Sequence, residues 1–303
     1  MGLITRRRLL ALTGTTFAGA ASAAAYAFRF EPQWFEVTEH EIPTRWLRKG
    51  NRIRLLHLSD FHARPIPLDW IEAAIELGKE TKPDLIVLTG DYVTDRVHPE
   101  LGVYAKLIRK LVDVAPTFGS MGNHDGGRWA DLKNRYDSSE ILRGMLADAG
   151  VVVPHNAHVE QQVAGERVQI VGIGDHWAKE QNAPLAFKAL PRQADCLRIV
   201  MSHNPDTKAI LQYFSWELML SGHTHGGQVV IPGFGPPILP VNDKRYYEGL
   251  HVYQGRRLYI TRGVGGVMGG VRFNCRPEIT VLDLVPGESP EELTESRPRR
   301  SNT

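Results

Sequence analysis

Five short segments of the chain carry metal-binding side chains, and they occur in a fixed order. They are Asp60-Phe61-His62, Gly90-Asp91, Gly122-Asn123-His124-Asp125, His203 and Gly222-His223-Thr224-His225. A pair of divalent cations needs one carboxylate that can bridge both ions, with further oxygen and imidazole ligands that leave the site Lewis-acidic. These segments supply such donors. The pattern therefore predicts a two-metal centre that can activate a water molecule.

The first three segments each follow a strand-like stretch. Apolar runs at residues 53–58, 84–88 and 116–121 read as buried strands, and helical spacing of apolar residues occurs at 68–79 and 100–112. Gly90 and Gly122 each precede a candidate ligand and suit a tight exit from a strand. Ligands gathered at the carboxyl ends of adjacent strands would form a crevice at one edge of an α/β sheet.

The second half of the chain is richer in strand patterns. They occur at residues 168–173, 197–201, 228–231, 258–261 and 279–284. Two facing mixed sheets with helices outside would bury both apolar faces. The predicted fold class is therefore α/β, a four-layer αββα sandwich with the metal site at the strand carboxyl ends. One such domain is expected over residues 29–286, followed by a disordered tail at 287–303 that lacks apolar periodicity.

Residues 1–28 read as a signal or anchor segment. Thr5-Arg6-Arg7-Arg8-Leu9-Leu10 resembles the twin-arginine pattern, and an uncharged stretch follows at residues 9–28. Small-residue cleavage sites lie at 23–25 and 25–27, yet the stretch is also long enough to span a bilayer. The pattern predicts recognition by the twin-arginine export machinery. The domain would then lie in the periplasm or on the outer face of the cytoplasmic membrane, with residues 9–28 as an anchor if they are retained.

Composition limits the partners. The net charge is +2 over 303 residues, so no specific nucleic-acid partner is expected. A basic cluster at Arg45, Arg48, Lys49, Arg52 and Arg54 is either a solvated surface or a contact with anionic lipid. The chain has two cysteines, Cys196 and Cys275, which excludes a disulfide-rich scaffold and leaves their pairing open.

Taken together, the motifs resemble those of the calcineurin-like metallophosphoesterase superfamily, and within it the YaeI-type bacterial phosphodiesterases. Beyond the five metal-binding segments, the resemblance rests on residues 31–35, 243–246, 261–265 and 274–278. A single D-x-H or G-H-x-H occurs often by chance, whereas the full ordered set is specific.

The resemblance implies a ligand set and a mechanism. One metal would be held by Asp60, His62 and His225, the other by Asn123, His203 and His223, and Asp91 would bridge them. A bridging hydroxide would attack the phosphorus of a phosphodiester in line. His124 would assist the leaving group, and Asp125 would orient His124. Manganese is the favoured metal, although iron, zinc and magnesium tolerate the same donors.

Three functions share these motifs. The first is a metal-dependent phosphodiester hydrolase, and the second is a UDP-2,3-diacylglucosamine pyrophosphate hydrolase-like enzyme of lipid A metabolism, as some relatives are. The third is a non-catalytic scaffold, which the intact motif disfavours. The charge-free loop at residues 229–241 directly follows the last metal-binding segment. If exposed, it would favour an aryl diester or a lipid-linked phosphate as substrate.

Two histidine-containing segments have structural interpretations. His57 ends an apolar strand and is expected to pack in the core. Asp175-His176-Trp177 follows Gly172 and Gly174 at another strand end, where a turn is favoured and a place beside the cleft is the alternative.

Overall fold

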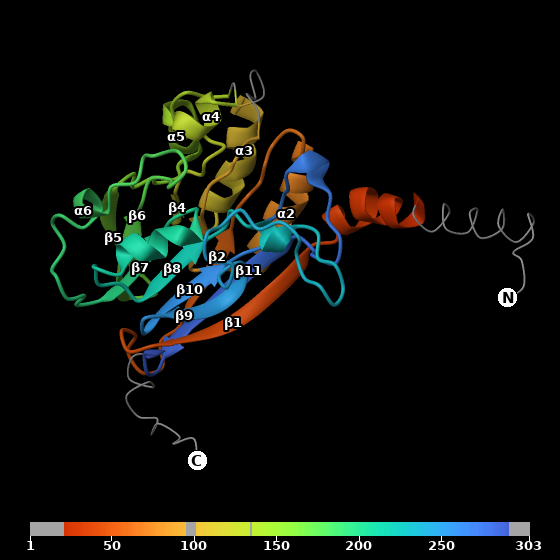
Figure 1. The fold of residues 1–303 in the computed structure, drawn as a ribbon. Helices are drawn as coiled ribbons and strands as arrows, with labels where there is room; N and C mark the ends of the chain where they lie inside the picture. The colour runs from red at the N-terminus through yellow and green to blue at the C-terminus, as the bar shows by residue number, and fades with distance from the viewer. Residues whose placement is uncertain (1–20, 95–100, 134, 291–303) are drawn as a thin grey trace, which may run out of the picture.

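Two β-sheets stacked face to face form the centre of the molecule (Figure 1). The computed structural model describes residues 21–94, 101–133 and 135–290. The first sheet contains, in spatial order, β1 (Glu36–Thr44), β11 (Glu278–Pro286), β2 (Ile53–Leu58), β3 (Leu85–Leu88) and β4 (Thr117–Gly119). The second contains β5 (Ala157–Val163), β6 (Glu166–Gly172), β7 (Leu197–Met201), β8 (Leu218–Ser221), β10 (Arg256–Ile260) and β9 (Gly249–Tyr253).

Both sheets are mixed. In the first, β2, β3 and β4 run parallel and β11 pairs antiparallel with β2. In the second, β6, β7, β8 and β10 run parallel, and the two edge strands β5 and β9 are antiparallel. The α-helices are α2 (Leu68–Glu80), α3 (Leu101–Val112), α4 (Gly127–Asp131), α5 (Glu140–Ala149), α6 (Ala183–Ala186) and α7 (Lys208–Leu211). Shorter helical turns are η1 (Tyr26–Phe30), η2 (Glu31–Gln33), η3 (Pro205–Thr207), η4 (His225–Gly227) and η5 (Met268–Gly270).

Successive side chains of each strand face opposite sides of the sheet, so each strand contributes to the core between the sheets and to the layer under the helices. Leu55 and Leu85 join the core between the sheets, whereas the neighbouring Leu56 packs with residues of α2, α3 and α5 on the outer face. On the second sheet, Ile199 faces inward and Val200 packs outward with residues of α6 and α7. The predicted α/β sandwich of two mixed sheets between helical layers is therefore confirmed.

Some predicted elements differ from the structure. The strand expected at residues 228–231 is wrong, because only isolated bridges form there, from Val229 to Phe273 and from Ile231 to Gly235. Repeated glycine and proline interrupt the pairing of that loop. The sequence interpretation also missed β1, β5, β8 and β9. Of these, β8 matters most because it carries two candidate ligands to the metal site.

The chain ends are described in part. Most of the predicted leader and residues 291–303 lie outside the described residues. The Ala27 carbonyl accepts a hydrogen bond from the Arg272 amide, and the Ser289 hydroxyl donates to Glu217, so the described parts of both ends pack on the domain. Within the described ranges, no helix has both the length and the hydropathy needed to cross a bilayer.

A buried carboxylate, Glu278, ties the two sheets together. It lies at the start of β11 and accepts hydrogen bonds from Thr38 of β1 (2.6 Å) and from Tyr259 of β10 (2.5 Å). It also pairs with Arg262 (3.3 Å). Burial alone would raise the pKa of Glu278, but Arg262 and the hydrogen bonds outweigh burial and lower the pKa below its ordinary value.

Glu278→Ala is expected to destabilise the fold by about 2–4 kcal/mol, because several donors lose a buried acceptor. Urea unfolding at pH 7 measures this change. Glu36→Ala is the matched control: Glu36 contacts the same Arg262 at 2.7 Å but its side chain is 37% exposed, so a loss below about 1 kcal/mol is expected. Since the pKa of Glu278 is lowered, its contribution to the stability of the fold is present at neutral pH. That contribution is lost as the pH falls through the lowered pKa. Equal losses in the two variants would contradict this role.

Candidate metal centre

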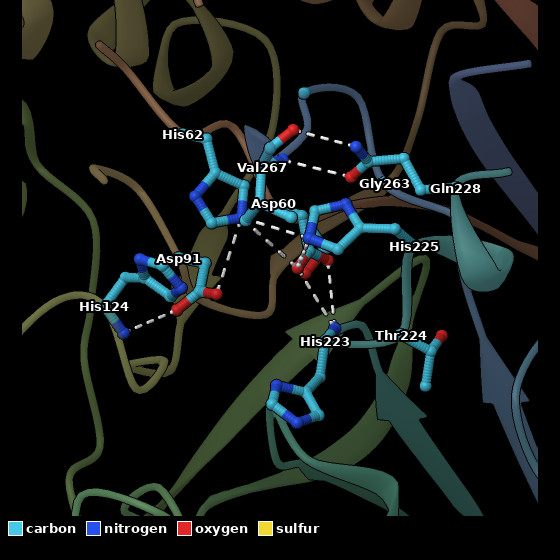
Figure 2. A network of polar contacts seen from close by, with 12 residues as sticks. Asp60, His62, Asp91, His124, His223, Thr224, His225, Gln228, Gly263 and Val267 are labelled. Carbon is cyan, nitrogen blue, oxygen red and sulfur yellow. Dashed lines mark hydrogen bonds and ion pairs between the residues drawn. The ribbon is translucent and has the colours of Figure 1, made fainter. Parts of the chain in front are cut away.

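The two sheets deliver the candidate ligands to one edge of the sandwich. Parallel neighbouring strands end at the same edge, so residues that follow them come together. Asp60 and His62 follow β2, Asp91 follows β3, Asn123 follows β4, His203 follows β7, and His223 and His225 follow β8. All seven are buried. The structure thus brings Asp60, His62, Asp91, His203, His223 and His225 together from both sheets, in overlapping groups whose ligand atoms lie within 4.8 Å of one another, and Figure 2 labels all of them except His203.

The backbone at these ligands adopts an uncommon conformation. Five of them have positive φ angles between 50° and 72°, namely Asp60, His62, Asp91, His223 and His225. Such angles cost free energy for a residue with a side chain and cluster where function requires them. Close packing holds the turns: a Cβ added at Gly222 would lie 2.1 Å from Asp60 Oδ2, so only glycine fits beside that carboxylate.

Three side chains form the first cluster. His225 Nε2 lies 3.1 Å from His62 Nε2 and 3.4 Å from Asp60 Oδ1. These are the three residues that the sequence interpretation assigned to one metal. Figure 2 shows their side chains converging, with Asp91 beside them.

A second cluster consists of Asp91, His203 and His223. Asp91 Oδ2 lies 3.1 Å from His203 Nε2, which in turn is 3.2 Å from His223 Nδ1. The same Oδ2 atom is 3.5 Å from His62 Nε2, so Asp91 stands between the two clusters. Asn123 Oδ1 is buried and forms no hydrogen bond with the described residues, which leaves it free as a ligand.

Hydrogen bonds at the back of the rings orient two imidazoles. His203 Nδ1–H donates to the Thr89 carbonyl (2.7 Å), and His223 Nε2–H donates to the Pro240 carbonyl (2.9 Å). Each bond fixes the tautomer, so the other nitrogen presents a lone pair to the centre of the pocket.

The charges of the pocket also suit cations. Burial lowers the pKa of His62 and His225 well below the ordinary value and that of His223 to about 3, so these rings are neutral and can ligate. Burial alone would lower the pKa of His203, but the carboxylates of Asp91 and Asp60 raise it well above the ordinary value. The two buried carboxylates thus favour the protonated form of His203. A bound cation would take the place of that proton.

The comparisons with known proteins agree with this geometry. A family model described as calcineurin-like phosphoesterase matches residues 53–227, more than half of the chain, and spans every predicted ligand. The chain belongs to the calcineurin-like phosphoesterase family. It is thus a divalent-metal-dependent hydrolase of phosphoric esters.

Relatives cover almost the whole length of this phosphoesterase. It is 39% identical to the phosphodiesterase YaeI of Escherichia coli (strain K12), over 93% of this chain and 100% of that protein. It is 32% identical to the uncharacterized metallophosphoesterase YkuE of Bacillus subtilis (strain 168), over 94% of this chain and 99% of that protein. The UDP-2,3-diacylglucosamine pyrophosphatase LpxG of Chlamydia muridarum is 24% identical over 90% of this chain and 98% of that protein.

His124 lies beside the clusters in this phosphoesterase, but its neighbours differ from the sequence prediction. Its backbone amide donates to Asp91 Oδ1 (2.9 Å), and its ring Nδ1 is 2.6 Å from Arg135 Nη1. Asp125 was expected to orient His124, yet its carboxylate accepts from the backbone amides of Gly122 (2.7 Å), Asp91 (2.8 Å) and neighbouring residues. Asp125 therefore fixes the two ligand loops, and Arg135 forms a hydrogen bond with the His124 ring.

Two tryptophans lie beside the site, and the sequence interpretation considered Trp177 but missed Trp129. The Trp129 ring centroid is 4.5 Å from that of His124, and the Trp177 centroid is 4.5 Å from that of His223. Asp175 is buried and holds the Trp177 turn by accepting from the Trp177 amide (2.7 Å). The segment 175–177 therefore has both properties considered from sequence, since it forms a turn and borders the metal pocket. Trp129 lies in α4, shortly after His124 in the chain, and that proximity was the available signal.

The remaining polar candidates have structural places. His57 is buried, as predicted, and its Nε2 is 2.8 Å from Thr89 Oγ1. Cys196 and Cys275 are both free and buried, so they form no disulfide with each other. The Cys275 thiol donates to the His225 carbonyl (3.2 Å), which places it behind a metal ligand.

Proposed function

We propose that this phosphoesterase hydrolyses phosphodiesters with two divalent cations held together by Asp91. The observation that carries the proposal is the position of Asp91 Oδ2, which lies 3.5 Å from His62 Nε2 of one cluster and 3.1 Å from His203 Nε2 of the other. A carboxylate between two sets of oxygen and nitrogen ligands is the arrangement that a two-metal site needs. The similarity to a phosphodiesterase at 39% identity supports the choice of a diester as substrate.

The ligands divide as the sequence interpretation assigned them. Asp60, His62 and His225 would hold one cation. Asn123, His203 and His223 would hold the other. When bound, the two cations would acidify a shared water and offset charge on the phosphoryl oxygens.

The chain itself supplies proton transfer to the leaving group. An arginine donates and does not accept, so His124 Nδ1 accepts from Arg135 and the ring proton resides on Nε2. An imidazole in this tautomer can donate that proton to the departing oxygen.

Manganese remains the metal that we favour for this site. The oxygen and nitrogen donors do not themselves select one ion.

A lipid-linked pyrophosphate is the second candidate substrate. LpxG, a UDP-2,3-diacylglucosamine pyrophosphatase, is similar to this chain over 90% of this chain's length. Its lower identity of 24%, against 39% for YaeI, places this candidate after the phosphodiester.

We place the catalytic domain on the outer side of the cytoplasmic membrane, after export by the twin-arginine machinery. The support is the sequence pattern of the leader, with three arginines at positions 6–8 followed by an uncharged stretch. An outward-facing domain also disfavours a cytoplasmic nucleotide-linked precursor as substrate.

Metal reconstitution with a paired substrate assay tests the proposed function. Chelator-treated protein should lose hydrolysis of bis(p-nitrophenyl) phosphate, and Mn²⁺ should restore it with about two ions bound per chain. p-Nitrophenyl phosphate is the control substrate and should be cleaved more slowly. Stoichiometric binding of one ion at full activity, or a preference for the monoester, would contradict the proposal.

A further inference from the structure

A group of large apolar side chains lies exposed around the metal-site edge. Their exposed fractions are 54% for Phe28, 65% for Phe30, 90% for Phe234, 67% for Ile238 and 65% for Met268. These residues come from η1, from the loop at residues 229–241 and from η5. Together we name them the apolar face. Clustered exposed apolar side chains of this size mark interaction surfaces.

Hydrogen bonds and ring contacts join the three segments. The Arg272 amide donates to the Ala27 carbonyl (2.9 Å), and the Val230 amide donates to the Phe273 carbonyl (2.8 Å). The Tyr26 and Phe273 rings meet edge to face, with centroids 6.3 Å apart. The segment around Phe273 thus lies between η1 and the loop and joins the two. In Figure 1, η1 emerges on the same side of the molecule as that loop.

The apolar face borders the metal pocket. The carbonyl of Pro240, in the loop, accepts the hydrogen bond from the metal-ligand candidate His223 (2.9 Å). Gln228, at the start of the loop, exchanges hydrogen bonds with Val267 (2.8 and 3.0 Å) beside η5, as Figure 2 shows. A molecule that covers this face would therefore lie beside the candidate metal ligand His223.

The charges fit a lipid surface with anionic headgroups. The loop at residues 229–241 contains no charged residue. Arg29 is exposed in η1, and Arg276, which pairs with Glu36 at 3.6 Å, stacks over Trp34, 4.2 Å from the ring centroid. Trp34 is itself 56% exposed. Apolar and aromatic side chains with arginines at their border are typical of proteins that lie in a membrane interface.

The sequence of the leader favours the same occupant. Residues 9–28 contain no charge, and the last of them belong to η1, which carries Phe28 of the apolar face. If this stretch is retained as an anchor, its membrane contact would hold the face at the lipid surface.

We propose that the apolar face rests on a bilayer containing anionic phospholipid and presents the metal pocket to an amphiphilic, lipid-linked phosphodiester. The substrate class rests on the proposed function, whereas the membrane contact stands on the surface alone. A lipid-borne phosphate would reach the pocket along the apolar face without leaving the interface.

The basic cluster considered from sequence lies at the other end of the sandwich. It occupies the turn between the end of β1 at Thr44 and the start of β2 at Ile53, opposite the metal edge. Its members are also paired: Arg48 contacts Glu166 at 2.9 Å, and Arg54 contacts Asp283 at 3.0 Å. This cluster therefore does not share the proposed membrane face and serves as a control.

The first test is a fluorescent reporter in the full-length chain. Phe234→Trp should show a blue-shifted emission and quenching by brominated lipid with phosphatidylethanolamine–phosphatidylglycerol vesicles, relative to the unsubstituted protein. Tyr213→Trp is the matched control, because Tyr213 is 82% exposed but lies before β8, at the opposite end of the strands. If the leader alone bound the vesicles, neither reporter would respond, and the proposal would be overturned.

The second test separates membrane contact from catalysis. Phe234→Ser/Ile238→Ser should weaken vesicle affinity about tenfold and leave hydrolysis of soluble bis(p-nitrophenyl) phosphate unchanged. The Arg45→Gln/Arg48→Gln/Lys49→Gln variant should bind as the unsubstituted protein does. The opposite pattern would assign the contact to the basic cluster. A Phe234→Trp shift that follows protein concentration without lipid would show instead that a second copy covers the face.

Discussion

Asp91→Ala should abolish metal retention and phosphodiester hydrolysis together. Asp91 is the one carboxylate within 3.5 Å of histidines from both clusters, so its removal opens each set of ligands at once. It also leaves His203 without its closest acidic partner. A fall in kcat/KM of at least about three orders of magnitude is expected, because the charge that holds the catalytic cations is lost.

Metal analysis of protein purified without added salts measures metal retention, and hydrolysis of bis(p-nitrophenyl) phosphate measures catalytic activity. Asp283→Ala is the matched control, since that carboxylate is buried but pairs with Arg54 (3.0 Å), in the turn at the far end of β2. It should lose stability and keep its metals. An Asp91→Ala protein that retained two ions with near-normal turnover would refute the shared role of Asp91.

The sequence was informative about the site because its ligands belong to short, ordered motifs. Asp60, Asp91 and Asn123 each follow an apolar run, so the strand ends and the crevice could be inferred before their distances were known. The inter-sheet arrangement also followed, because strands with two apolar faces need cover on both sides.

The surroundings of the site were less accessible to this reasoning. Arg135 reaches His124 from the segment after α4, and no local pattern connects the two residues. Asp125 was expected to bond to the adjacent His124, but its carboxylate accepts hydrogen bonds from backbone amides instead. Sequence spacing indicates neighbours along a turn, whereas the direction of each side chain depends on tertiary packing.

The position of the apolar loop could not be inferred for the same reason. The pattern at residues 229–241 fits a buried core segment and an exposed rim equally well. The structure decides between them, since Phe234 is 90% and Ile238 is 67% exposed. Repeated glycine and proline keep this loop out of both sheets, so its apolar side chains have no strand partner to cover them.

His124→Ala should keep the metals and lose most of the turnover. A ring nitrogen of His124 lies within 4.8 Å of the ligand atoms of His62 and Asp91 but belongs to neither assigned ligand set, and the backbone amide still donates to Asp91 Oδ1 in the variant. Without the Nε2 proton donor, a fall in kcat of about 10²–10⁴ is expected, with little change in bound metal. The loss should grow as the leaving alcohol becomes less acidic, because a poor leaving group depends more on protonation.

Arg135→Lys separates the proton donor from its orienting partner. It should lower kcat less than His124→Ala does, because a lysine can still donate to His124 Nδ1 but without the fixed geometry of the guanidinium. Kinetics with a series of aryl and alkyl diesters, measured alongside metal content, distinguishes these cases. If His124→Ala were slowed equally for every leaving group, the ring would act in binding or positioning, and proton donation would have to be assigned to another group.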